Sequence, residues 1–396
     1  MQTITTTDNG AASISKINSN FIAADTLGGT VVNYSDYASL QAAINDAATT
    51  KCNVWLPYNT VVPIPSTLYL MNNVRIIGNG STLQWTGSAG SPMISNYTTG
   101  SLLFQSGMEN IFLDTNTSNQ PNVILDLHSP LECKFKDITY LNGSATLTVL
   151  QIRCDVAVLN WESNCNAAYN IFDNITGYYG TYAATCGYGV VLQGTASPYG
   201  FITLNEFKDF EFPDCRVMGY SLVQWCDDNV FTGVHRVELN ANNAVGITFN
   251  SSSTPSVDVG VYNNPFSLFA PDIFGAYTGR LGVVINNCQS VIIENLFWTS
   301  SSWAYNTILV NNYAQNYWVK CVGYSNGVIG ILTKGVDFDQ GFGIGTGPWA
   351  GCDKAISFTN GTPPSGNPTT GGCLYASAGA LYWKGSSGTV TKIANA

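Results

Sequence analysis

The sequence predicts an all-β fold, a parallel β-helix in which short strands wind into coils that stack along one axis. From about residue 100 to residue 335 the chain consists almost entirely of short apolar segments separated by Gly, Asn and Pro, the pattern of strands and turns. In the same region a motif of the form Asn-x-Phe-x-x-apolar recurs, which indicates one inward position repeated from coil to coil. The Asn-Gly hairpins and clean alternation that favour a β-sandwich are sparse.

The recurring motif is clearest where it begins at Asn170, Asn205 and Asn229, and weaker relatives begin at Cys133 and Val291. Its aromatic position is occupied by Phe135, Phe172, Phe207 and Phe231, at steps of 37, 35 and 24 residues. A solenoid produces irregular steps at a constant inward position, because insertions become loops on the outside of the coils.

A helix is predicted over residues 36–49, ahead of the coils. Ser35 or Asp36 can cap its first turn. Its apolar face is formed by Leu40, Ala43, Ile44 and Ala47. Solenoids need covered ends, so this helix is expected to cap the first coil.

The chain is expected to have three parts. Residues 1–30 carry Ile14, Ile17 and Phe21 at spacings of three and four, an apolar stripe that needs a docking partner. Residues 31–360 form the β-helix body. Residues 361–396 form a Pro- and Gly-rich linker and a C-terminal β module of about two strands, too short to hold a core of its own.

The composition argues against several classes of partner. Only 10% of the residues are charged and the formal net charge is −10, so no basic stripe is available for nucleic acid. No apolar run is long enough to span a membrane, and the first residues lack the pattern of a signal peptide. A surface rich in Asn, Ser, Thr and Gly suits neutral polar ligands.

No metal site and no cofactor are expected. The 11 cysteines include no Cys-x-x-Cys pair, which indicates free, buried thiols in a chain that folds in a reducing cytoplasm. The two histidines, His128 and His235, stand alone in strand-like segments and are interpreted as hydrogen-bonded or exposed side chains.

Three stretches resemble bacteriophage tail fibre and tailspike proteins. Lys16-Ile-Asn-Ser-Asn-Phe21 is similar to an N-terminal segment of virion attachment proteins. Leu40-Gln-Ala-Ala-Ile-Asn45, followed by Val54-Trp-Leu-Pro57, resembles the first coil of pectate-lyase-like tailspikes, although Tyr58-Asn-Thr60 lacks the glycine usual there. Gly379-Ala-Leu-Tyr-Trp-Lys-Gly-Ser-Ser-Gly-Thr-Val-Thr-Lys-Ile-Ala394 resembles a short C-terminal module of phage structural proteins.

The resemblance implies a right-handed β-helix in a virion component that is usually a homotrimer. It places such a chain in the phage tail, assembled in the cytoplasm of the bacterial host. It also implies that residues 1–30, with Ile14, Ile17 and Phe21, contact other tail or baseplate proteins.

Tailspikes of this kind often cleave the polysaccharide that they bind. The candidate catalytic carboxylates are Asp209, Glu211 and Asp214, because inward-facing Phe210 and Phe212 leave Asp209 and Glu211 together outside, about 6.6 Å apart along a strand. The alternative is that they are solvated surface carboxylates. The short Gly-His-Gly and Trp-Ile-Asp-His elements of related lyases are absent, which favours binding over cleavage.

Aromatic residues in Gly-, Ser- and Asn-rich segments suit sugar rings and hydroxyls. The candidates are Tyr178, Tyr179, Trp298, Trp303, Tyr317 and Trp318. The sequence therefore predicts a tail fibre or tailspike that binds a host-surface polysaccharide. Two alternatives stay open, a polysaccharide hydrolase on the same fold and a purely structural baseplate or capsid decoration protein.

Overall fold

The computed structural model describes residues 31–96, 102–154, 167–178, 184–194, 200–223, 225–250, 261–262, 264–272, 280–286, 292–296, 308–310, 318–321, 331–332, 363–368 and 371–395. The chain divides into two compact units, residues 1–334 and 335–396. The boundary expected after residue 360 and the attachment segment 1–30 lie outside the described residues.

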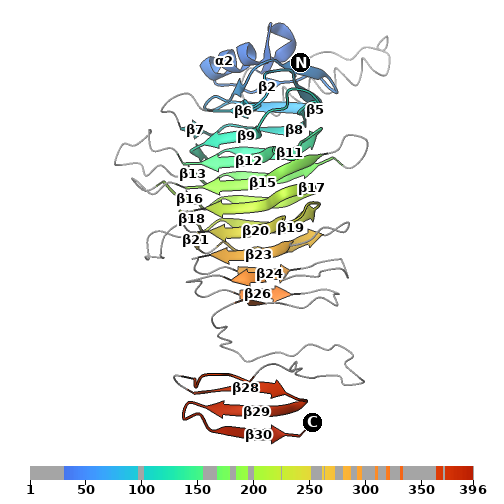
Figure 1. The fold of residues 1–396 in the computed structure, drawn as a ribbon. Helices are drawn as coiled ribbons and strands as arrows, with labels where there is room; N and C mark the ends of the chain where they lie inside the picture. The colour runs from blue at the N-terminus through green and yellow to red at the C-terminus, as the bar shows by residue number, and fades with distance from the viewer. Residues whose placement is uncertain are drawn as a thin grey trace, which may run out of the picture. The chain divides into compact units, whose positions relative to one another are not determined.

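The first unit is a right-handed parallel β-helix (Figure 1). Its strands lie in three rows, called A, B and C here, and each strand pairs in parallel with the strands of the coils before and after it. Rows A and B belong to one continuous sheet because β17 (Glu206–Val223) runs through both of them, and row C is a separate sheet.

Row A consists of β1 (Val32–Asn33), β2 (Val54–Trp55), β3 (Val61–Ile64), β5 (Arg75–Trp85), β8 (Gly107–Asp114), β11 (Lys134–Leu141), β14 (Ile171–Gly177), the first half of β17, β19 (Val230–Leu239), β22 (Phe269–Asp272), β24 (Ile292–Leu296) and β26 (Trp318–Cys321). Row B consists of β4 (Leu68–Tyr69), β6 (Ile94–Ser95), β9 (Val123–His128), β12 (Thr148–Arg153), β15 (Thr185–Gln193), the second half of β17, β20 (Val245–Asn250), β23 (Leu281–Asn286), β25 (Ile308–Val310) and β27 (Ile331–Leu332). Row C consists of β7 (Leu103–Phe104), β10 (Pro130–Leu131), β13 (Ala167–Ala168), β16 (Ile202–Thr203), β18 (Cys226–Asp227) and β21 (Val261–Tyr262).

A ladder of buried asparagines lies at the turn from row C to row A. Asn205 Oδ1 accepts hydrogen bonds from the backbone N–H and the Nδ2 of Asn170, at 3.1 and 2.7 Å. Asn205 in turn donates to Asn229 Oδ1, and Asn229 donates to Asn264 Oδ1. Each Nδ2 of these three donors also reaches a backbone carbonyl of the previous turn. The ladder therefore satisfies buried backbone groups at a bend where no strand can pair with them.

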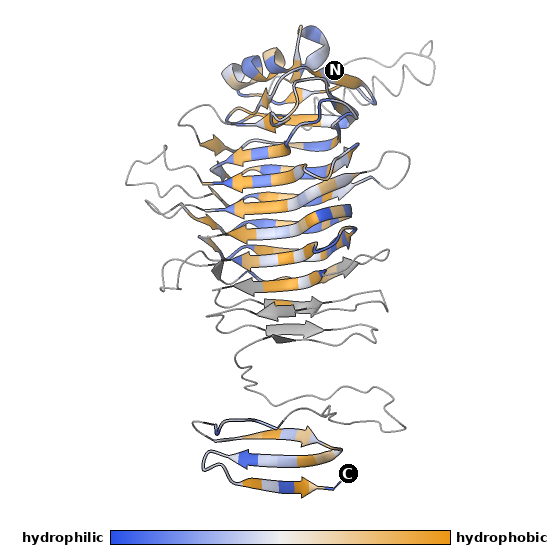
Figure 2. Ribbon diagram, viewed as in Figure 1, coloured by the Kyte–Doolittle hydropathy of each residue, from blue (hydrophilic) through white to orange (hydrophobic). Residues whose placement is uncertain are grey.

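The phenylalanines of the motif stack on one another inside the β-helix, which confirms the predicted repeat. Rings of Phe135, Phe172, Phe207, Phe231 and Phe266 follow one another at centroid distances of 5.3, 5.1, 4.7 and 3.9 Å, with planes within 10° of parallel. Figure 2 shows apolar residues recurring at the same places on successive strands. Stacking places one buried ring in each of these five coils, so the core grows by repetition along the axis.

A second set of bends divides four strands of row A, namely β8, β11, β14 and β17. Asn110, Asp137, Asn174 and Asp209 occupy equivalent positions on four coils, with φ between 51° and 57°. Asn and Asp tolerate this left-handed backbone better than other residues with side chains. These bends turn the chain from one flat strand segment into the next.

The N-terminal end of the β-helix is covered by the 3₁₀ turn η1 (Tyr34–Asp36) and by α2 (Leu40–Thr50). The predicted apolar face is confirmed, since Leu40, Ala43, Ile44 and Ala47 are all buried. The predicted cap was wrong. Ser39 caps the helix by accepting from the N–H of Ala42, because Ser35 and Asp36 are taken up by the turn.

The second unit holds an antiparallel sheet of β28 (Gly372–Ser377), β29 (Ala380–Gly385) and β30 (Val390–Ala394), one strand more than expected. Tyr375 and Tyr382 stack at 5.3 Å between ring centroids, and Lys384 Nζ donates to the carbonyl of Pro364. Every residue of β30 is exposed, as the small size of the module predicts.

Replacing Asn205 with alanine tests the ladder. The variant leaves the N–H of Asn170 and the carbonyl of Ala167 without partners, so the free energy of unfolding should fall by about 3 kcal/mol, at roughly 1–3 kcal/mol per buried unsatisfied group. Urea denaturation measures the loss. The control Asn174→Gly, at an exposed left-handed bend, should change stability by less than about 1 kcal/mol. Equal effects of the two changes would contradict a structural role for the ladder.

Candidate functional site

The outward side chains of row B form two columns that run from coil to coil. Residues 126, 151, 191, 221 and 248 align in the first column, and residues 128, 153, 193, 223 and 250 align in the second. Their polar members are Asp126, His128, Gln151, Arg153, Gln193, Ser221, Thr248 and Asn250. The inward neighbours on these strands, such as Leu150, Leu192 and Ile247, are fully buried. We call this set of eight the polar columns.

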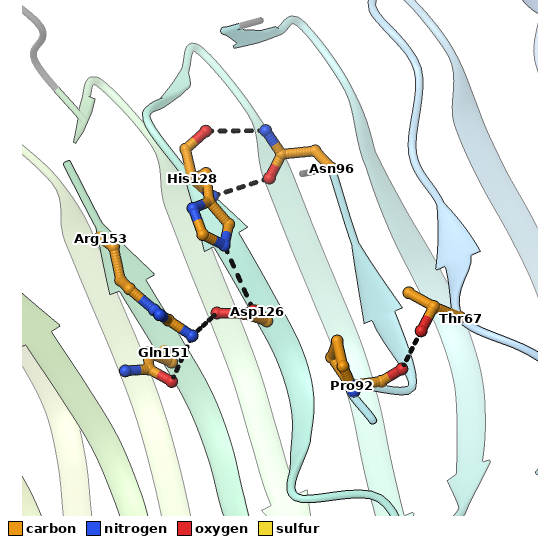
Figure 3. A network of polar contacts seen from close by, with 7 residues as sticks. All are labelled: Thr67, Pro92, Asn96, Asp126, His128, Gln151 and Arg153. Atoms are coloured by element: carbon orange, nitrogen blue, oxygen red, sulfur yellow. Dashed lines mark hydrogen bonds and ion pairs between the residues drawn. The ribbon is translucent and has the colours of Figure 1, made fainter. Parts of the chain in front are cut away.

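A network of polar contacts occupies the N-terminal end of the polar columns (Figure 3). Asp126 accepts from Arg153 Nη2 at 2.9 Å with one oxygen and lies 3.2 Å from His128 Nε2 with the other. Gln151 Oε1 lies 3.2 Å from the same Arg153 nitrogen. Asp126 and His128 are buried although they point away from the core, whereas the side chain of Arg153 is 38% exposed.

The backbone of His128 is fixed by a side chain of the preceding coil. Asn96 Nδ2 donates to the His128 carbonyl, and Asn96 Oδ1 accepts from the His128 N–H, both at 2.7 Å. Thr67 similarly ties its turn to the carbonyl of Pro92 (Figure 3). Both oxygens of Asp126, the carboxylate in this network, are therefore engaged, one by Arg153 and the other by His128.

Each of the three predicted catalytic carboxylates has a different partner. Asp209 has a left-handed backbone at a bend of β17, and its Oδ1 accepts from the N–H of Val234. Phe210 and Phe212 are buried as expected, but the bend removes the straight strand on which the 6.6 Å spacing was based. Asp209 therefore has a structural role at this bend.

The other two carboxylates are held in ion pairs. Glu211 Oε1 lies 2.9 Å from Arg236 Nη1, and the same guanidinium contacts Glu238 at 3.0 Å. Asp214 pairs with Arg216 at 2.6 Å and accepts from Thr185 Oγ1. These pairs are partly exposed and contribute little to stability. Arg236 therefore contacts two carboxylates, those of Glu211 and Glu238.

The predicted sugar-binding aromatics fall almost entirely outside the described residues. Tyr178 is 42% exposed at the end of β14 and donates its N–H to Tyr140. Trp318 begins β26, where only the backbone is described. Tyr179, Trp298, Trp303 and Tyr317 lie outside the described residues, as do Ile14, Ile17 and Phe21.

Both histidines are hydrogen-bonded, and His235 lies deep in the core. Its Nε2 is 2.9 Å from the carbonyl of Thr232, so this nitrogen carries the proton, and Nδ1 accepts from the hydroxyl of Tyr220 at 2.8 Å. Burial among the rings of Phe207, Phe231 and other aromatics lowers the pKa of His235 to about 4. A neutral imidazole enclosed in this way has no access to a ligand.

The described cysteines are free thiols within the β-helix and the C-terminal module. None of Cys52, Cys133, Cys154, Cys186, Cys215, Cys226 and Cys373 forms a disulfide. Burial raises the pKa of Cys133 to about 11 and that of Cys215 well above its usual range, so both stay protonated and unreactive.

Within the described parts of the chain, no group of three or more His, Cys, Asp or Glu side chains is arranged to hold a metal ion. A search of the same residues finds no helix with the length and apolar character needed to cross a membrane.

Sequence reasoning missed the network around Asp126 because its members come from three coils. A signal was nevertheless present. Val123-Ile-Leu-Asp-Leu-His128 and Thr148-Val-Leu-Gln-Ile-Arg153 both place two polar residues at alternate positions of an apolar strand, the pattern of side chains that share the outward face.

No protein-family model matches the sequence, and no curated protein matches it either. Among solved structures, PfbA, a surface adhesin of Streptococcus pneumoniae, aligns at a TM-score of 0.51 and 9% identity over 73% of this chain and 83% of its own. The protein ORF18 of Geobacillus virus E2 aligns at a TM-score of 0.39 and 13% identity, covering 100% of this chain and 91% of its own. Tailspike protein 3 of bacteriophage CBA120 aligns at 0.30 and 12% identity, covering 98% and 77%.

The alignment with the adhesin shows a shared fold and, at this identity, the fold alone. The two phage proteins align over nearly the whole chain at TM-scores too low to define a common fold. The alignment with the adhesin therefore agrees with the parallel β-helix that the strand pairing defines.

The buried His235 predicts a pH dependence of stability. Its pKa is lowered to about 4 in the folded chain from 6.5, so between those values the unfolded chain binds a proton that the folded chain does not. Stability should therefore fall as the pH drops from about 6.5 to 4, by about 3 kcal/mol from this group. Urea denaturation of wild type and His235→Gln over this range isolates the contribution. Parallel stability curves for the two proteins would refute it.

Proposed function

We propose that this chain is a subunit of a phage tail fibre or tailspike that attaches the virion to a host-surface polysaccharide through the polar columns of row B. The observation that carries the proposal is the sequence of amides and hydroxyls at Gln151, Gln193, Ser221, Thr248 and Asn250 on successive strands. Strands lie about 4.8 Å apart, so a glycan that runs along the axis meets a new polar group on every coil. Amides and hydroxyls recognise sugar hydroxyls without requiring charge.

The resemblance of the N-terminal segment to virion attachment proteins supports the rest of the assignment. In this proposal residues 1–30, with Ile14, Ile17 and Phe21, dock on other tail or baseplate proteins. Three copies of the chain form the working fibre. Tyr178, Tyr179, Trp298, Trp303, Tyr317 and Trp318 remain proposed as further sugar contacts.

A polysaccharide hydrolase is the second candidate, and one observation favours it. Glu211 and Glu238 both contact the guanidinium of Arg236, so two carboxylates lie close together on the outside of row A. Such pairs perform glycoside hydrolysis when one carboxyl is protonated. Binding is favoured because both carboxylates are engaged in ion pairs with Arg236.

Binding is tested with a panel of purified capsular polysaccharides and lipopolysaccharide O-chains. Wild type should be retained on at least one immobilised polysaccharide without shortening it in solution, and Gln193→Ala with Asn250→Ala should weaken retention by about tenfold or more, since each lost hydrogen bond contributes roughly 0.5–1.5 kcal/mol. The matched control Thr139→Ala with Thr176→Ala, on the outside of row A, should bind normally.

Each other outcome has a defined meaning. Shortening of the polysaccharide that is abolished by Glu211→Gln would replace the attachment role with the hydrolase. Retention that survives the row B changes would move the binding site elsewhere. A lack of retention on the polysaccharides of strains to which the virus adsorbs would favour a purely structural baseplate or decoration protein.

A further inference from the structure

The antiparallel sheet of the second unit carries a tryptophan that lies flat on its surface. Trp383 on β29 is 42% exposed. A Cβ atom added to Gly372 on β28 would lie 2.2 Å from Cζ2 and 2.5 Å from Cε2 of this indole, and no other indole atom would lie closer than 2.9 Å. The glycine therefore lies beneath the face of the ring and not against its edge. Gly372 is the register partner of Gly385, so neither strand has a side chain here that would lift the ring from the sheet.

Hydroxyl groups surround the exposed indole. Thr391 on β30 is the register partner of Trp383 and is exposed. Trp383 Nε1 and Ser387 Oγ lie 3.9 and 3.8 Å from the point at which Gly385 would carry a Cβ atom, so an N–H donor and a hydroxyl border the same space. Ser387 Oγ also lies 3.1 Å from the hydroxyl of Thr389. A flat ring with hydroxyls beside it matches a sugar, which has an apolar C–H face and hydroxyls at its rim.

The side chains on the other face of this sheet contact the chain itself. The ring of Tyr382 stacks on that of its register partner at 5.3 Å, and Lys384 Nζ donates to the carbonyl of Pro364. Side chains alternate between the two faces of a strand, so Trp383 projects away from these contacts. Its register partner Leu374, which is 39% exposed, projects in the same direction.

The charges of the C-terminal segment also suit a polysaccharide. Residues 361–396 contain Lys384 and Lys392 and no Asp or Glu, whereas the whole chain has a formal net charge of −10. No carboxylate of this segment therefore repels an acidic polysaccharide, and the two lysines attract one at long range. A stable protein contact needs a large, well-packed area, and one indole beside a leucine and several hydroxyls offers little apolar surface.

We propose that Trp383, Ser387 and Thr391 form a second polysaccharide-binding site, on the C-terminal module. The apolar face of one sugar ring stacks on the indole, and the hydroxyls of the sugar bond to Trp383 Nε1 and to the side chains of Ser387 and Thr391. The site belongs to the second unit of the chain. It therefore goes beyond the attachment proposed for row B and does not depend on it.

The first test alters the indole platform in two ways in the full chain. Trp383→Ala removes the ring, whereas Gly372→Ala keeps the ring but adds a methyl group 2.2 Å from Cζ2, so the ring must tilt away from the sheet. Both variants should lose about tenfold or more in affinity for a polysaccharide that retains wild type, as expected for an aromatic anchor. The control Gly366→Ala, whose methyl group would have no atom within 4 Å, should bind like wild type. Unchanged affinity of both test variants would overturn the site.

The second test maps the contact on the unaltered chain. Hydroxyl radicals oxidise exposed aromatic side chains, and mass spectrometry of the peptides reports the oxidation of each one. Bound polysaccharide should slow the oxidation of Trp383 by about twofold or more, because a sugar covers the exposed face of its ring. Tyr58, which is 74% exposed in the β-helix, is the internal control and should be oxidised at the same rate with and without polysaccharide.

Two results of this mapping would contradict the proposal. Oxidation of Trp383 that does not change at saturating polysaccharide would exclude the indole as a contact. Protection of Trp383 that increases with protein concentration when no polysaccharide is present would assign this face to a protein contact.

Retention of the variants on the same polysaccharides separates the two proposed sites. Retention that is abolished by Gln193→Ala with Asn250→Ala and unchanged by Trp383→Ala would overturn the C-terminal site and keep the polar columns. The reverse result would keep the C-terminal site and remove the polar columns from attachment. Wild type that is retained on none of the polysaccharides would overturn both.

Discussion

The structure depends on the asparagine ladder between rows C and A. Each coil turns sharply from row C into row A, and the backbone groups at that turn lose the partners that strands provide. Asn170, Asn205, Asn229 and Asn264 satisfy those groups while buried, and the side chains of the first three are bonded to the coils on both sides. Because each asparagine fixes the height of its neighbour, the phenylalanines two residues later stack in register, and the outward side chains align in columns.

That alignment explains how a chain with few charges presents organised surfaces. Residues that are 24 to 37 positions apart in the sequence become neighbours one strand spacing apart, so a column of similar side chains becomes a continuous strip. Row B carries amides and hydroxyls, and the outside of row A carries alternating charges such as Lys136, Asp173 and Lys208. The corner between rows C and A carries both charged and apolar residues, Glu132, Tyr169, Leu204 and Asp228 on successive coils. Each strip offers a different chemistry along the same axis.

The titratable groups in the interior have structural roles. His235 and Tyr220 satisfy each other within a cluster of aromatic rings, and the cost of burying two polar rings is offset by that hydrogen bond and by the Thr232 carbonyl. Cys186 and Cys215 are register partners that face inward on neighbouring coils. All four of these side chains are fully buried, so none of them is accessible to a ligand.

The sequence by itself determined the elements that depend on local pattern. The Asn-x-Phe motif predicted the coils and their inward position, and the apolar spacing predicted the face of α2. One further copy, Asn264-Pro-Phe266, was missed because proline interrupts the strand pattern, yet its side chains continue both the ladder and the stack. The helix is capped by Ser39 and not by the predicted Ser35 or Asp36, because these two residues belong to the 3₁₀ turn η1.

Only the tertiary structure decided which outward residues meet. Coil lengths vary, so the register that brings Asp126, Arg153 and Asn96 together, or places Tyr169 beside Leu204, follows from pairing between coils and not from spacing within one. The same pairing places Asp209 at a bend, where its Oδ1 accepts from the N–H of Val234 on the next coil. The local sequence determines which residues each coil contains. Hydrogen bonds between coils determine which residues of neighbouring coils lie side by side.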